Sequence, residues 1–269
     1  MSVVWLRLLP VLACALGLGV VFAEPLASGL ARQTGDPVDP RFTEFLFAHG
    51  WQWVRGAAAR GLFGLPIAFP LEGTLAYAEP MVSFGVFYWP LRALGLSSGD
   101  SHQLWLIALG AVNFACFYAF ARRGLGLGTV GATASAMLFA FGLPRVAEVG
   151  HSQLWAQPFV VAIAWGMFLL LSEHAGPRER RIGVVAVCAG FVLQTWGGLY
   201  NAIFAVYACV VAGAFALVHP AWRARTLATA REVGLFAGVA LAVAIACVLP
   251  VLVAYLDVHQ TTSDWHPRQ

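Results

Sequence analysis

The chain has 269 residues, of which 60% are hydrophobic and only 11% are charged, and its mean hydropathy is +0.76. Soluble domains carry about 25% charged residues, so this composition excludes an ordinary water-soluble domain and places most of the chain in lipid. The formal net charge of +3 is too small and too scattered for a nucleic-acid-binding surface. The five cysteines lie in apolar runs without a CxxC pair, which argues against a zinc site or a disulfide framework.

Apolar runs long enough to cross a bilayer recur along the whole chain. A transmembrane helix needs about 20 predominantly apolar residues to span a hydrocarbon core of ~30 Å. The pattern predicts an all-α polytopic membrane protein with about seven transmembrane helices. The seven runs are 3–23, 102–121, 127–143, 152–173, 182–199, 200–218 and 233–256.

The first run has two interpretations. Arg7, the apolar core and the stretch Val21-Phe22-Ala23 before Glu24 are typical of a signal peptide. The apolar run is long for a cleavable signal, which favours an uncleaved membrane anchor. Both interpretations place residue 24 in the outer compartment, so the predicted topology is the same for both.

An eighth apolar stretch, 81–97, can be a span or a helix along the membrane surface, because it contains Pro90 and Arg92. If it does not cross and the N-terminus is cytoplasmic, the arginine clusters of three short loops face the cytoplasm together with Arg7, which is the positive-inside pattern. We therefore predict a multi-pass protein of the bacterial inner (plasma) membrane with a surface helix over residues 84–94. The arginines on the inner side are Arg7, Arg122, Arg123, Arg178, Arg180, Arg181, Arg223, Arg225 and Arg231.

In this topology the segment 24–101 is a long first outer loop. Pro40 fits the first position of a helix and Asp39 its N-cap. Apolar residues recur at helical spacing from 41 to 60, which predicts an amphipathic helix on the membrane surface. An extended segment follows and leads to Tyr77 and Glu79.

Carboxylates of this loop are candidates for catalysis. Asp36 and Asp39 can supply a general base or ligands for a divalent metal such as Mg²⁺ or Mn²⁺, and Asp36 is the preferred base because it has no evident structural role. Glu79 can be a second acid or ligand. The structural alternatives are a helix cap for Asp39 and a solvated loop carboxylate for Glu79.

The second and third outer segments add further polar groups. The loop 144–153 contains Arg145, Glu148, His151 and Gln153, and the outer turn after it contributes Tyr200. Arg145 can neutralise a phosphate or anchor the chain at lipid headgroups, and Glu148 can pair with it. Three polar loops on one side of a helical bundle can converge into a cavity. The tryptophans near the predicted boundaries are assigned by default to an aromatic belt: Trp51, Trp53, Trp89, Trp105, Trp155 and Trp196.

Residues 30–205 contain a set of short motifs in a particular order. The motifs are Gly35-Asp36-Pro37-Val38-Asp39-Pro40, Phe69-Pro70, Leu75-Ala76-Tyr77-Ala78-Glu79, Ala121-Arg122-Arg123, Arg145, His151-Ser152-Gln153-Leu154, Leu193-Gln194 and Leu199-Tyr200. In this order they resemble bacterial membrane proteins of the GT-C glycosyltransferase superfamily, YfhO-like proteins among them. The chain departs from the pattern at Glu148, where histidine is expected, and it stops soon after the seventh run.

The resemblance implies a GT-C-like transmembrane module over residues 1–256 and an outer polar tail, 257–269, that is truncated or leads into further spans. It also implies transfer of a sugar from a polyprenyl-phosphate donor to a glycan, lipid or protein acceptor of the cell envelope, on the outer face of the membrane. The expected catalytic residues are Asp36, Asp39 and Glu79, and the expected substrate-binding residues are Tyr77, Arg145, Glu148, His151, Gln153 and Tyr200.

Two other classes of function remain open. One is a transporter or flippase of lipid-linked glycans, and the other is a non-catalytic membrane subunit. The only charged residues in the predicted spans are Arg7 and Glu173, each near one end of its span, whereas transporters tend to place charges in the middle of their spans. This contrast favours chemistry at the membrane surface.

Overall fold

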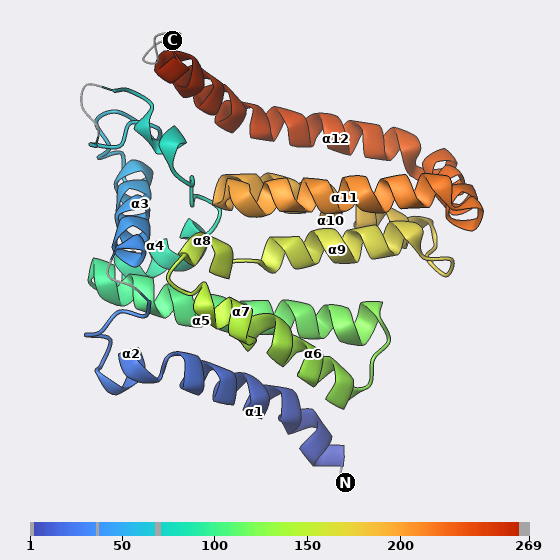
Figure 1. The fold of residues 1–269 in the computed structure, drawn as a ribbon, viewed down its shortest axis with the longest axis horizontal. Coiled ribbons are helices and arrows are strands. Elements are labelled where there is room, and N and C mark those ends of the chain that lie inside the picture. Colours follow the sequence, from blue (N-terminus) through green and yellow to red (C-terminus); the bar gives the residue numbers. More distant parts are fainter. Residues whose placement is uncertain (1–2, 36–37, 68–70, 264–269) are drawn as a thin grey trace, which may run out of the picture.

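The computed structural model describes residues 3–35, 38–67 and 71–263, and every regular element in them is helical. The long helices lie side by side, and the shorter elements α2, α3, α4 and α8 gather at one end of the bundle (Figure 1). The long helices are α1 (Val3–Val21), α5 (Ser98–Ala119), α6 (Thr129–Phe141), α9 (Pro158–Leu171), α10 (Pro177–Gly197), α11 (Leu199–Val218) and α12 (Pro220–Ser263). The short elements are α2 (Ala23–Ala27), α3 (Asp39–Val54), η1 (Thr74–Tyr77), α4 (Gly85–Ala93), η2 (Phe120–Gly124), α7 (Leu143–Ala147) and α8 (Ser152–Trp155).

Five helical stretches of the described chain are long and apolar enough to cross a membrane. They are Ser98–Gly124, Thr129–Ala147, Ser152–Leu171, Leu199–Val218 and Pro220–Gln260. Two of the seven expected spans fall outside this group. The apolar part of α1, Trp5–Val21, is shorter, and α10 begins with a charged turn that contains Arg178, Arg180 and Arg181.

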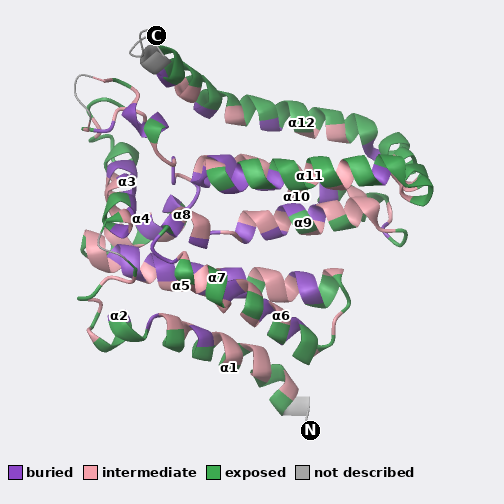
Figure 2. Ribbon diagram, viewed as in Figure 1, coloured by how far each residue is buried: buried purple, intermediate pink, exposed green. Residues whose placement is uncertain are grey.

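The outer surface of the bundle is apolar. Large hydrophobic side chains on α11 and α12 are widely exposed, among them Val211, Val218 and Leu235, of which Leu235 is 88% exposed. Figure 2 shows the same contrast, with exposed residues along most of α12 and buried residues concentrated near α4, α5 and α8. Water does not tolerate so continuous an apolar surface, so the chain is an α-helical membrane protein.

Helix α4 is too short to cross the bilayer. It has nine residues, which at 1.5 Å per residue span about 14 Å. Pro90 lies inside it, and the chain turns at Gly95 in the left-handed conformation. This length agrees with the expectation that 81–97 does not cross, and the stretch is not among the five candidate spans.

Helix α3 differs from the prediction at both ends. It starts with Asp39 as its first residue, Val38 is the N-cap, and the helix ends at Val54 instead of reaching residue 60. Asp39 as N-cap is therefore wrong by one position. The face with Leu46, Phe47 and His49 is buried under neighbouring chain, and the His49 ring pairs with the carbonyl of Leu62 at 2.7 Å.

Helix α12 is longer than the predicted seventh span. It begins at Pro220 instead of 233 and continues through 257–263, where we expected a polar tail. Residues 264–269 of that tail lie outside the described residues.

The main core lies near the polar end of the bundle. It is built from aromatic residues, with Phe47 against Trp105 at 4.6 Å between ring centroids and Phe22 against Trp155 at 5.8 Å. Trp105 and Trp155 have no exposed surface, so the aromatic-belt assignment is wrong for these two. Their indole N–H groups donate to the carbonyls of Phe84 and Leu106, each at 3.1 Å. The core thus fixes the helix ends that carry the outer loops.

Candidate functional site

The first and second outer loops meet at His151. Nε2 of His151 lies 2.9 Å from Oδ2 of Asp39, and Nδ1 lies 3.2 Å from Oε2 of Glu148. A neutral imidazole can donate to one of these carboxylates, and a protonated one can donate to both. The imidazole therefore fixes the position of Asp39 relative to the second loop.

A pair of glycines allows this approach. Gly35 has φ +91°, and a Cβ added there would lie 2.6 Å from Cα of Gly150. Real Cβ atoms do not come so close to backbone. The absence of a side chain at Gly35 therefore lets the two loops pack directly on each other, one residue before His151.

A cavity of about 500 Å³ opens beside Asp39. Its walls come from the start of α3, the segment around η1, the second loop, the start of α11 and the far end of α12. Five of the expected site residues line it: Asp39, Tyr77, Glu79, Gln153 and Tyr200. The other lining residues are Phe42, Thr43, Ala76, Ala78, Leu199, Ile203 and Tyr255.

Glu79 reaches the N-terminus of α11. Its carboxylate accepts hydrogen bonds from the backbone N–H groups of Leu199 and, at 3.4 Å, Tyr200. An α-helix leaves its first N–H groups without partners inside the helix, and its dipole favours negative charge there. Burial raises the pKa of Glu79 above its ordinary value, and the two backbone bonds oppose the rise only in part. The first outer loop is thus tied to the third.

Asparagine side chains form hydrogen bonds with the backbone where helices are interrupted near the cavity. The Asn201 side chain donates to the carbonyl of Gln153 at 3.0 Å. Asn113, buried inside α5, donates to the carbonyl of Trp155 at 2.7 Å and accepts from the N–H of Gln157 at 3.2 Å. These bonds satisfy polar backbone groups where the chain passes from α8 to α9.

The Arg145 side chain points into the same break and does not line the cavity. Its guanidinium donates to the carbonyls of Phe139 at 3.1 Å, Leu154 at 2.7 Å and Trp155 at 3.1 Å. It also lies over the rings of Phe139 and Trp155. Its polar groups are therefore engaged by the chain itself.

Asp36 lies outside the described residues. Among the residues that the structure describes, no group of three or more His, Cys, Asp or Glu side chains could hold a metal ion.

Tyr255 is a lining residue that sequence reasoning missed. Its hydroxyl donates to the carbonyl of Ala78, which joins the far end of α12 to the segment before Glu79. Tyr255 lies within the seventh apolar run, 177 residues from its partner, and no neighbouring polar residue distinguishes it. The sequence therefore gave no indication that Tyr255 lines the cavity.

The chain has no significant match among protein-family models, curated protein sequences or solved structures. The resemblance to the GT-C superfamily thus rests on the ordered motifs alone.

Proposed function

We propose that the protein is a GT-C-type membrane glycosyltransferase that moves a sugar from a polyprenyl-phosphate donor to a cell-envelope acceptor. The observation that carries the proposal is the cavity with Asp39 and Glu79 in its walls, next to the contact between Asp39 and His151. Transfer with inversion needs one base for the acceptor hydroxyl and space for a sugar. A cavity of about 500 Å³ falls in the size range of small-molecule sites.

Asp39 is the proposed base. Its side chain is 42% exposed, so an acceptor hydroxyl can reach it, and His151 orients it while Glu148 orients His151. The acceptor hydroxyl gives its proton to Asp39, its oxygen bonds to the anomeric carbon, and the bond between that carbon and the phosphate oxygen breaks. The phosphate leaves on the polyprenyl carrier.

The remaining lining groups suit the sugar and the phosphate. Tyr77 and Tyr200 are 48% and 58% exposed and present aromatic faces and hydroxyls. No arginine is found among the described residues that line the cavity, so hydroxyl and amide donors of Tyr77, Tyr200 and Gln153 take the phosphate contacts in this proposal. Arg145 acts here by supporting the second loop.

The proposal includes seven spans, with α1 and α10 crossing beside the five apolar stretches. The turns that carry the arginine clusters, before α6, α10 and α12, lie at the opposite end of the bundle from α3 and α4 (Figure 1). Ion pairs of Arg180 with Glu232 and of Arg225 with Glu173 join these turns. Positive-inside orientation then assigns the cavity to the outer face of a bacterial inner membrane and the N-terminus to the cytoplasm.

The test uses the full-length protein in proteoliposomes with synthetic polyprenyl phosphates that carry radiolabelled glucose, galactose, mannose or N-acetylglucosamine. Membrane lipids and glycans extracted from the source cells serve as acceptors. Asp39→Asn should lower transfer by ~10²–10⁴, the usual loss for a missing general base. The matched control is Glu72→Gln, an exposed carboxylate of the same outer loop that does not line the cavity.

If the wild type consumes none of the four donors, the proposal is rejected. An Asp39→Asn variant with undiminished transfer would also reject it. Helical circular dichroism and a single size-exclusion peak establish that each variant is folded.

A further inference from the structure

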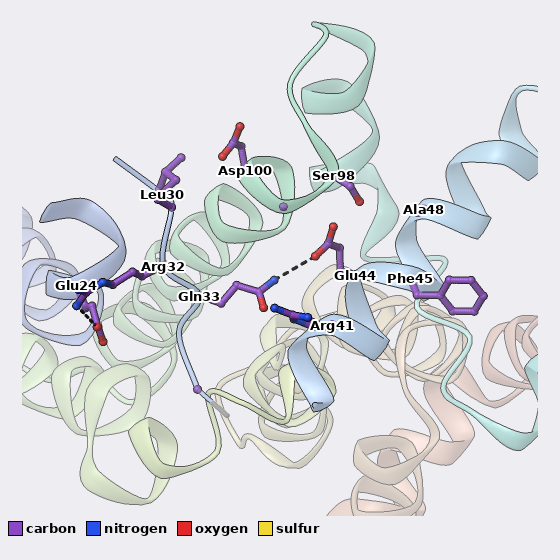
Figure 3. Close-up of a pocket in the computed structure, with 13 residues that line it drawn as sticks. Glu24, Leu30, Arg32, Gln33, Arg41, Glu44, Phe45, Ala48, Ser98 and Asp100 are labelled. Carbon is purple, nitrogen blue, oxygen red and sulfur yellow. Dashed lines mark hydrogen bonds and ion pairs between the residues drawn. The ribbon is translucent and has the colours of Figure 1, made fainter. Parts of the chain in front are cut away.

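A second, larger cavity lies on the other side of α3 (Figure 3). Its volume is about 1000 Å³, and its walls come from the segment after α1, from α3 and from the first turn of α5. The α3 residues in its wall are Arg41, Glu44, Phe45 and Ala48, the spacing of one helix face. Asp39, Phe42 and Thr43 line the other cavity, so α3 separates the two.

Charges of both signs line this second cavity. Two are arginines, Arg32 and Arg41, and three are carboxylates, Glu24, Glu44 and Asp100. Arg32 pairs with Glu24 at 2.8 Å.

The groups at the centre of the cavity are only partly satisfied by the protein. Glu44 accepts one hydrogen bond, from the Gln33 amide at 3.1 Å, and Figure 3 shows Arg41 beside these two side chains. Arg41 forms no ion pair with any residue that the structure describes. Asp100 accepts a hydrogen bond from the Ser97 hydroxyl at 2.7 Å. One cation, Arg41, and two carboxylates, Glu44 and Asp100, thus line the same cavity without an ion pair among the three.

The cavity lies where two apolar helices end. α1 ends at Val21, shortly before Glu24, and α5 starts at Ser98, with Ser98 and Asp100 in the cavity wall. When these helices are embedded in lipid, the ends of their apolar parts fall at the boundary of the hydrocarbon core. The cavity is then at the depth of the phospholipid headgroups.

We propose that this second cavity binds the phosphoethanolamine headgroup of an outer-leaflet phospholipid. The phosphate lies against Arg41, with Arg32 at its edge, and the primary ammonium donates to Glu44 and Asp100. Leu30 and Phe45 at the wall contact the first carbons of the lipid. This inference does not depend on sugar transfer at the other cavity.

The charge pattern distinguishes this headgroup from the other common ones. A phosphatidylglycerol headgroup brings only negative charge and leaves Glu44 and Asp100 facing a phosphate, which costs binding energy. A choline headgroup has a cation without N–H groups and cannot hydrogen-bond to carboxylates. Of these three headgroups, only phosphoethanolamine offers an anion and a hydrogen-bonding cation a few ångströms apart.

The test is native mass spectrometry of the detergent-purified, full-length protein. The probes are phosphatidylethanolamine, phosphatidylcholine and phosphatidylglycerol with identical palmitoyl and oleoyl chains. We expect phosphatidylethanolamine to bind most tightly. Arg41→Gln should weaken it roughly tenfold, as the loss of one charge-assisted contact predicts, and Arg41→Lys should restore most of the binding.

A matched control is Arg178→Gln, at an exposed arginine of α10 that does not line the cavity, which should leave binding unchanged. Replacing both Glu44 and Asp100 by their amides makes the lining net positive and should shift the preference to phosphatidylglycerol. Tighter binding of either other lipid to the wild type, or unchanged phosphatidylethanolamine binding in Arg41→Gln, would overturn the proposal. Displacement of the lipid by free phosphoethanolamine at equal concentration would assign the cavity to a soluble ligand instead.

Discussion

A variant of Arg145 can distinguish whether this residue binds the donor phosphate or stabilises the fold. Its guanidinium donates to the carbonyls of Phe139, Leu154 and Trp155, where the chain passes from α6 through α7 and α8 to α9. Replacement of Arg145 by methionine keeps an apolar side chain of similar length and removes all three donors. Each of the three carbonyls then loses one donor, although Leu154 still accepts from the Gln157 side chain and Trp155 from the Asn113 side chain.

A hydrogen bond to a charged group contributes roughly 1.5–3 kcal/mol, and the lower bound or less applies here because Arg145 is partly exposed. Three bonds at about 1 kcal/mol each give a loss of about 3 kcal/mol in the free energy of unfolding. For a chain of this size, 1 kcal/mol lowers Tm by roughly 2–4 °C, so the expected fall is about 6–12 °C.

The measurement is thermal unfolding in detergent, followed by fluorescence-detected size exclusion and by circular dichroism. Arg178→Met, at an exposed arginine of α10, should shift Tm by less than about 2 °C. A variant Arg145→Met that unfolds within about 2 °C of the wild type but no longer binds the polyprenyl-phosphate donor would refute the structural role. That result would return Arg145 to the phosphate site.

Three further predictions follow from other parts of the chain. Burial raises the pKa of Glu79, so the native state holds this proton more tightly than the unfolded chain does. The stability that the protonated Glu79 contributes is therefore complete below the ordinary pKa of a glutamate. It is lost as the pH rises through the raised pKa. In a Tm series from about pH 4 to pH 7, Glu79→Gln should therefore lose less stability with rising pH than the wild type, and parallel curves would contradict this. Gly166→Ala should destabilise the protein by about 1–3 kcal/mol, because the new Cβ would lie 2.7 Å from the carbonyl oxygen of Gly183, where α9 packs on α10. The control is Gly213→Ala, which has open space around it and should be neutral in the same unfolding assay. An impermeant thiol reagent applied to intact cells should label single cysteines placed in segment 24–101 but not at Arg122, Arg180 or Arg225; labelling at those arginines and not in the loop would invert the topology.

The sequence by itself determined the class of protein and most of its helices. Low charge and long apolar runs require a lipid solvent, because buried backbone in lipid is satisfied within helices. The ranges 152–173 and 200–218 match α8–α9 and α11 closely, since each is bounded by turn or polar residues. The prediction that 81–97 does not cross came from Pro90, Arg92 and the side of the membrane on which the arginine clusters would fall. The sequence also singled out five residues that line one cavity: Asp39, Tyr77, Glu79, Gln153 and Tyr200.

Only the tertiary structure decided what these residues touch. Asp39 suits an N-cap by local rules, yet it contacts His151, because Gly35 and Gly150 allow two loops more than 100 residues apart to pack together. The sequence suggests that Arg145 faces lipid headgroups or a phosphate, but in the fold the end of α8 presents two carbonyls to it and α6 presents a third. Tyr255 enters the cavity through the path of α12. Contacts of this kind depend on the distances between helix ends, and residue type and spacing along the chain do not encode those distances.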